Sequence, residues 1–103
     1  MDDEAKNIID KISKKFNPIK IIVFGSYANG NVHKDSDLDL LLILETTLPK
    51  YKRASLIKLE LVPYSIPLDL LIYTPEEYNK WKNTTNHIIK EIDKNGIVVY
   101  ERK

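Results

Sequence analysis

Three aspartates in two short segments are the residues of this chain best suited to chemistry. Asp37 and Asp39 are separated by one residue, and Asp69 follows thirty residues after Asp39. In an extended strand, residues two apart leave the same face, so Asp37 and Asp39 would project together while the alternate leucines point the other way. Adjacent carboxylates repel each other, and a divalent cation relieves that repulsion. Mg²⁺ prefers hard oxygen ligands from one or two carboxylates and a substrate phosphate, so the pattern indicates a metal-nucleotide site.

Asp-x-Asp also occurs in acidic loops, where the residues serve as turns or caps. Here Asp39 is followed by the apolar run 40–44, and Asp69 is embedded among Leu68, Leu70 and Leu71. Runs of this length and composition are typical of buried strands. A carboxylate at the edge of such a strand is seldom left unpaired, because burying a charge is costly. The context therefore favours a site over a solvated turn.

Gly25 and Ser26, separated from Asp37 by ten residues, are suited to holding a phosphate. Gly25 has no Cβ, so a backbone turn at this position can approach a phosphate closely. Ser26 offers a hydroxyl and a backbone N–H at the start of a predicted helix, where anions are favoured. A plain strand-to-helix turn with a serine cap would use the same two residues, and the downstream carboxylates favour the phosphate-binding interpretation.

Alternating helices and strands must position these residues. The apolar spacing and the breakers predict helices over 2–16, 27–31, 50–62, a short segment after Thr74, and 85–94, and strands over 19–24, 37–44, 68–73 and 97–100. Asn17-Pro18 ends the first helix, and Thr74-Pro75 begins the fourth with an N-cap and a proline at the first helical position. Alternation of this kind with about four strands predicts an α/β or α+β domain with a mixed sheet.

The length and composition limit the possible classes of protein. A chain of 103 residues with 43% hydrophobic content is expected to form one domain over 1–103. It contains no apolar stretch near the roughly 20 residues that span a bilayer, and its acidic start differs from a signal peptide. The lack of cysteine fits a cytoplasmic setting. The net charge of +1 gives no electrostatic case for direct nucleic-acid binding.

The combination of Gly25-Ser26, Ser36-Asp37-Leu38-Asp39-Leu40 and Pro67-Leu68-Asp69-Leu70 resembles the signature of the DNA polymerase beta nucleotidyltransferase superfamily. The short length is similar to its minimal nucleotidyltransferase branch, the MntA-like antitoxins. The resemblance covers nearly the whole chain. It implies an α+β fold with a small mixed sheet of about four strands and helices packed largely on one face.

The resemblance also implies a chemistry. Asp37 and Asp39 would hold the Mg²⁺ that travels with ATP, Asp69 would complete a second Mg²⁺ site, and Gly25, Ser26 and Ser36 would bind the nucleotide. The reaction would be attack of a hydroxyl on the α-phosphorus of ATP with pyrophosphate leaving. Relatives often carry arginine in the turn after Gly-Ser, where this chain has Tyr27 and Asn29, and Lys34 is a candidate substitute.

The resemblance implies a partner protein as well. Minimal nucleotidyltransferases resemble antitoxins that place AMP on a tyrosine of a HEPN-domain toxin. Two alternatives stay open: an antitoxin that neutralises its partner by binding alone, and a transferase that acts on a small-molecule hydroxyl. His33, His87 and the pair Tyr78 and Trp81 are expected to be surface or packing residues rather than catalytic ones.

Overall fold

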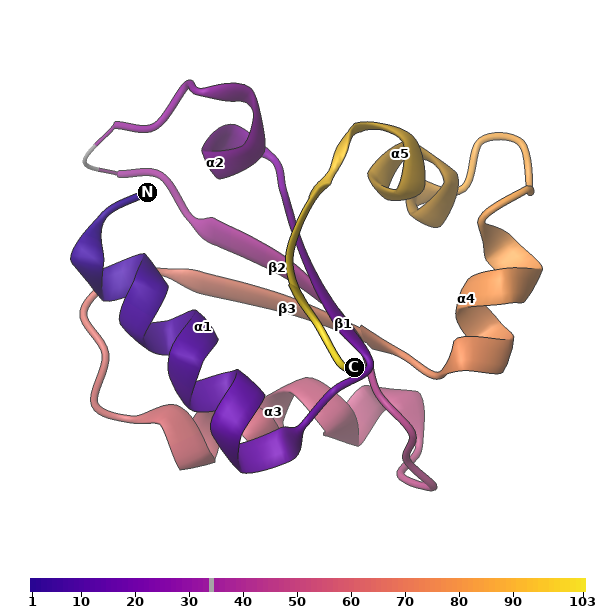
Figure 1. Cartoon of the computed structure of the whole chain (residues 1–103), viewed down its shortest axis with the longest axis horizontal. Coiled ribbons are helices and arrows are strands. Elements are labelled where there is room, and N and C mark those ends of the chain that lie inside the picture. The colour runs from indigo at the N-terminus through magenta and orange to yellow at the C-terminus, as the bar shows by residue number, and fades with distance from the viewer. Residues whose placement is uncertain (34) are drawn as a thin grey trace.

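The protein is described here by a computed structural model that covers residues 1–33 and 35–103, so the candidate Lys34 lies outside the described residues. Figure 1 shows a four-stranded sheet flanked by helices. The elements in chain order are α1 (Asp3–Phe16), β1 (Lys20–Phe24), α2 (Ser26–Asn29), β2 (Leu38–Ile43), α3 (Lys50–Leu61), β3 (Leu68–Tyr73), α4 (Pro75–Trp81), α5 (Ile88–Asn95) and β4 (Ile97–Glu101).

The sheet is mixed, as predicted. Its strand order is β3-β2-β1-β4. β1 runs antiparallel to both β2 and β4, whereas β2 and β3 are parallel and are connected through α3. This topology places the C-terminal end of β1 and the N-terminal ends of β2 and β3 at the same end of the sheet. The predicted site residues lie at that end.

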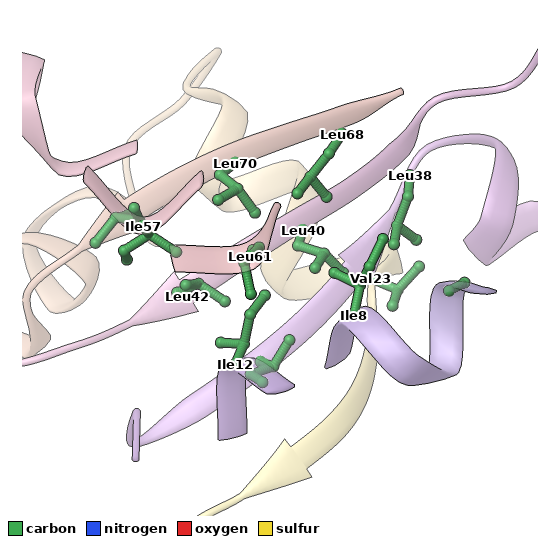
Figure 2. Packing of buried hydrophobic residues seen from close by; sticks show 13 residues of the cluster. Ile8, Ile12, Val23, Leu38, Leu40, Leu42, Ile57, Leu61, Leu68 and Leu70 are labelled. Carbon is green, nitrogen blue, oxygen red and sulfur yellow. The ribbon is translucent and has the colours of Figure 1, made fainter. Parts of the chain in front are cut away.

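The two faces of the sheet carry separate apolar clusters. The alternate residues Leu38, Leu40 and Leu42 of β2 are fully buried on the face that α1 and α3 cover. Figure 2 shows their side chains packed with Ile8 and Ile12 of α1 and with Ile57 and Leu61 of α3. The α+β class is thus confirmed, with the two longest helices on one face.

The opposite face is covered in part by the two short helices α4 and α5. Leu41 and Ile43 of β2 pack there against Tyr78 of α4 and against Ile89 and Ile92 of α5. Tyr78 is therefore a packing residue, as expected, and its hydroxyl donates a hydrogen bond to Asp93. This face is the one toward which Asp39 projects, because Asp39 and Leu41 are two residues apart in a strand.

Helix ends follow the predicted signals. Asp2 caps α1 by accepting a hydrogen bond from the Ala5 amide at 2.8 Å, and Asn17 ends it in the left-handed conformation at φ 45°. Thr74 and Glu77 form a reciprocal capping box at the start of α4. These caps satisfy amides that a helix terminus leaves without an intrahelical partner.

The predicted helix over 85–94 was wrong at its start. α5 begins only at Ile88, because Asn86 adopts a positive φ of 65° and His87 is the N-cap. The Nδ1 atom of His87 accepts a hydrogen bond from the Ile89 amide at 3.1 Å. Its ring also stacks on Trp81 with centroids 4.5 Å apart, so His87 is a half-buried structural residue.

Within the described ranges, every helix is too short or too polar to cross a bilayer.

Candidate active site

Asp39 and Asp69 lie next to each other on parallel strands. They are direct Cα partners in the β2–β3 register, so their side chains leave the same face of the sheet. Asp37 lies two residues before Asp39, immediately before β2 begins. Asp37 and Asp69 are exposed and Asp39 is half-buried. The fold thus gathers the three predicted carboxylates at one end of one face.

The electrostatics of Asp39 reflect this gathering. Partial burial raises the pKa of Asp39, and the negative charges of Asp69 and Asp37 raise it further. All three effects disfavour the ionised carboxylate. A cation at this position would reverse the balance, because it would replace the repulsion between like charges with attraction.

Gly25 closes the site from the end of β1. A Cβ at Gly25 would lie 2.2 Å from Oδ2 of Asp39, which is a severe steric clash. The backbone of Gly25 has φ 69° and ψ −146°, a region that is essentially restricted to glycine. The requirement for glycine therefore comes from contact with a carboxylate, in addition to any approach by a phosphate.

Ser26 begins the single turn of α2, and its side chain is half-buried. In the described part of the chain, no side chain caps this turn, because its N-cap is Gly25. The first amides of a helix have no intrahelical acceptor, so they remain suited to bind an anion.

Tyr27 points away from the carboxylates. Its hydroxyl donates to Oδ2 of Asp2 at 3.1 Å, which connects α2 to the start of α1. Burial and this hydrogen bond to Asp2 raise the pKa of Tyr27. Tyr27 thus has a structural role in this turn.

Ser36 stabilises the loop before the Asp pair. Its Oγ accepts a hydrogen bond from the His33 amide at 2.9 Å, and its own amide donates to the His33 carbonyl at 2.9 Å. Ser36 is buried, whereas His33 is exposed. This reciprocal turn stabilises the backbone just before Asp37 and the start of β2. A role of Ser36 in nucleotide binding stays a prediction.

A cavity of about 320 Å³ adjoins Gly25 between α2 and α5. Its volume is at the lower end of the range for small-molecule pockets, about 300–1,000 Å³. Asn95 donates to Glu91 across 2.6 Å at its wall. Of the lining residues, Gly25 was predicted from the sequence, whereas Glu91 and Asn95 carried no such signal, because their spacing is that of an ordinary solvated helix face. The cavity is lined by Phe24, Gly25, Ala28, Asn29, Ile88, Glu91, Ile92, Asn95 and Gly96.

The carboxylates of Asp37, Asp39 and Asp69 are suitable ligands for a hard cation, although their side chains are not arranged around one. Among the described residues, no three side chains of His, Cys, Asp or Glu already form a metal-binding group. Three carboxylates on one face, one of them with a pKa raised by burial and by the charges of its neighbours, are nevertheless the ligands that Mg²⁺ prefers.

An ion pair of a buried arginine, near the end of β3 and away from Asp69 at its start, was not identified from the sequence. Arg53 of α3 is 7% exposed, and its guanidinium lies 2.7 Å from Oε1 of Glu77. It also donates to the carbonyls of Leu48 and Ile72, so it links α3, the end of β3 and the start of α4. Arg53 holds the pKa of Glu77 at about 2, chiefly through their hydrogen bond. The only sequence signal was an arginine inside an apolar helical stretch.

Comparison with known proteins shows the family of the chain. Residues 5–99 match the model of the nucleotidyltransferase domain. Two candidate protein adenylyltransferases of Methanocaldococcus jannaschii are each 32% identical, over 78% and 79% of this chain and 77% of their own length.

Solved structures show the same fold. A candidate nucleotidyltransferase from Sulfolobus solfataricus superposes with a TM-score of 0.65 at 18% identity, covering 96% of this chain and 78% of that one. A toxin-antitoxin structure with AMP-PNP gives a TM-score of 0.58 at 20% identity, covering 98% and 75%. With the family match over residues 5–99 and the two relatives at 32% identity, the chain belongs to the nucleotidyltransferase domain family.

Proposed function

We propose that this nucleotidyltransferase is a metal-dependent protein adenylyltransferase and the antitoxin of a toxin-antitoxin pair. It would move AMP from ATP to a tyrosine hydroxyl of a partner HEPN-domain toxin. The observation that carries the proposal is the pairing of Asp39 with Asp69 across parallel strands, with Gly25 against the Asp39 carboxylate. The adenylyltransferase names of the relatives and the toxin-antitoxin neighbour with AMP-PNP support it.

Each carboxylate would have a defined role. Asp37 and Asp39 would hold Mg²⁺ with the ATP phosphates, and Asp37, Asp39 and Asp69 together would hold a second Mg²⁺. Bound Mg²⁺ would neutralise charge on the attacking and leaving oxygens. Asp69, on the edge strand β3, is open to an incoming hydroxyl group.

The reaction forms one bond and breaks one. The acceptor oxygen bonds to the α-phosphorus, the bond from that phosphorus to the bridging oxygen breaks, and pyrophosphate leaves. The acceptor's proton passes to Asp69 or to water. Positioning and charge neutralisation account for most of such catalysis.

The nucleotide would extend from the carboxylates past Gly25. The amides at the start of α2 would bind the phosphates in place of the arginine fork of relatives. The adjoining cavity, which is mainly apolar with the Glu91 and Asn95 side chains at its wall, would accept the base or the ribose.

Neutralisation of the toxin distinguishes catalysis from occlusion. The double variant Asp37→Asn and Asp39→Asn keeps the shape of the site and removes its charge, so neutralisation at substoichiometric amounts should be lost. The variant Asp35→Asn changes an exposed carboxylate in the preceding loop and should neutralise normally. Full neutralisation by the double variant at matched concentration would instead indicate that binding alone is the mechanism.

A further inference from the structure

Asn95 lines the cavity between α2 and α5 with half of its side-chain amide engaged and half available. Its Nδ2 donates a hydrogen bond to Oε1 of Glu91 at 2.6 Å, one helical turn earlier in α5. A carboxylate only accepts hydrogen bonds, so this contact fixes which end of the amide faces Glu91. Oδ1 and the second N–H of Asn95 make no hydrogen bond with another described residue, so both remain available to a ligand.

The cavity is continuous with the candidate active site through Gly25. Gly25 lines the cavity, and the carboxylate of Asp39 lies directly against its backbone. Figure 1 shows α2 and α5 at the same end of the sheet, where β1 ends. A nucleotide whose phosphates bind at the carboxylates therefore has its base or its ribose within reach of the cavity.

The lining favours the base. The walls are mainly apolar and include Phe24, Ile88 and Ile92. The described residues of the lining include one carboxylate, Glu91, and no lysine or arginine, so the cavity disfavours a phosphate. A volume of about 320 Å³ suits one end of a nucleotide. A planar base buries its apolar faces against such walls and directs its polar edge toward the few polar groups.

The end of α5 that carries Asn95 is held in place by close packing. A Cβ at the next residue, Gly96, would lie 2.5 Å from Cγ2 of Ile22 and 2.6 Å from the carbonyl oxygen of Ile92. The Gly96 amide donates to that same carbonyl at 2.8 Å. Ile22 and Ile92 are both buried between α5 and the sheet. A binding group on such a packed element needs little reordering when its ligand arrives, which favours specificity.

We propose that Asn95 recognises the adenine base of the nucleotide and that Glu91 is a positioning residue for its amide. The inference rests on the proposed function, because the phosphates must first bind at the carboxylates of the candidate active site. Oδ1 of Asn95 accepts a hydrogen bond from the exocyclic amine of adenine, and the available N–H donates to the adjacent ring nitrogen. Asparagine forms the same pair of hydrogen bonds with adenine when proteins recognise DNA.

This arrangement disfavours a purine that carries oxygen in place of the amine. Hypoxanthine has a carbonyl oxygen at the position of the adenine amine. Oδ1 of Asn95 then faces another acceptor, because the bond to Glu91 prevents the amide from turning over. A site built around hydrogen bonds rejects an analogue that cannot form them, because polar groups removed from water stay unpaired.

The affinities of the full chain for ATP and for inosine triphosphate, each with Mg²⁺, test the proposal by isothermal titration calorimetry. The two nucleotides differ only in adenine against hypoxanthine. The wild type should bind ATP about tenfold more tightly, as expected for a pair of hydrogen bonds to a base. Asn95→Ala should remove this preference by weakening ATP and leaving inosine triphosphate unchanged. Asn83→Ala changes an exposed asparagine outside the cavity and should keep the wild-type preference.

Glu91→Gln tests the positioning role. Glutamine both donates and accepts, so the amide of Asn95 is no longer held in one orientation. The preference for ATP should decrease, and the affinity for inosine triphosphate should not fall.

Two results would overturn the proposal while nucleotide binding stands. One is equal affinity of the wild type for the two nucleotides, and the other is a preference for ATP that Asn95→Ala retains. Failure of both nucleotides to bind to the wild type would overturn this inference together with the proposed function.

Discussion

The backbone of Gly25 touches the carboxylate of Asp39, so that a Cβ at position 25 would lie 2.2 Å from Asp39 Oδ2. One end of β1 therefore fixes the position of a carboxylate on β2. Gly30, in contrast, has a positive φ of 81° but nothing within 4 Å of its Cβ position. The two glycines separate two effects: backbone strain alone, and strain combined with a clash at the site.

Gly25→Ala should therefore destabilise the fold by about 1–3 kcal/mol and displace Asp39. Gly30→Ala should cost about 1–2 kcal/mol through strain alone. The stabilisation by Mg²⁺ and ATP, measured as a shift in melting temperature, should be lost in Gly25→Ala and kept in Gly30→Ala. An unchanged shift in Gly25→Ala would show that the contact with Asp39 does not matter for binding.

Asp39→Asn should have opposite effects on stability and on binding. Without metal, the asparagine removes a partly buried charge that Asp69 and Asp37 repel, so the melting temperature should stay the same or rise. With saturating Mg²⁺ and ATP, the wild type should gain stability by mass action and the variant should gain none. Asp35→Asn, an exposed neighbour, should respond like the wild type. Equal shifts of the melting temperature in all three proteins would show that Asp39 does not contribute to the binding of Mg²⁺ and ATP.

Much of this arrangement follows from local sequence signals. The one-residue spacing of Asp37 and Asp39, with leucines between and after them, predicted which face of β2 carries the aspartates and which face carries Leu38, Leu40 and Leu42. The proline and acidic residues after Thr74 predicted α4 with its cap. These features depend on residues close together in the chain, and local chemistry decides them.

Other features depend on residues that meet only in the folded chain. The direct pairing of Asp39 with Asp69 requires the register of two parallel strands. The ion pair between Arg53 and Glu77 joins positions 24 residues apart. Apolar residues of α3 such as Leu59 gave no sign of which ones would be buried, because both faces of that helix are apolar.

The ion pair between Arg53 and Glu77 should make the free energy of unfolding depend on pH in the acidic range. The pKa of Glu77 falls to about 2 in the folded state from an ordinary 4.5, so its contribution is complete above pH 4.5. That contribution is lost as the pH falls from 4.5 toward 2. Glu77→Gln should lower the free energy of unfolding at pH 7 by roughly 1–3 kcal/mol.

The free energy of unfolding, measured by denaturant titration between pH 7 and pH 2, checks this expectation. The difference between wild type and Glu77→Gln should shrink across the acidic range. Glu76→Gln changes the exposed neighbour in the same helical turn and should follow the wild type throughout. A difference that stays constant from pH 7 to pH 2 would contradict a role for the Glu77 charge.

Transfer of label from ATP to a HEPN-domain partner protein tests the central claim most directly. In the presence of Mg²⁺, ATP labelled at the α-phosphate should label a tyrosine of the partner, and ATP labelled at the γ-phosphate should not. The Asp37→Asn and Asp39→Asn double variant should transfer nothing, because the ligands of the proposed metal site are gone. Transfer of the γ-label, or equal α-labelling by the double variant, would contradict the claim that these three carboxylates catalyse adenylylation of the partner.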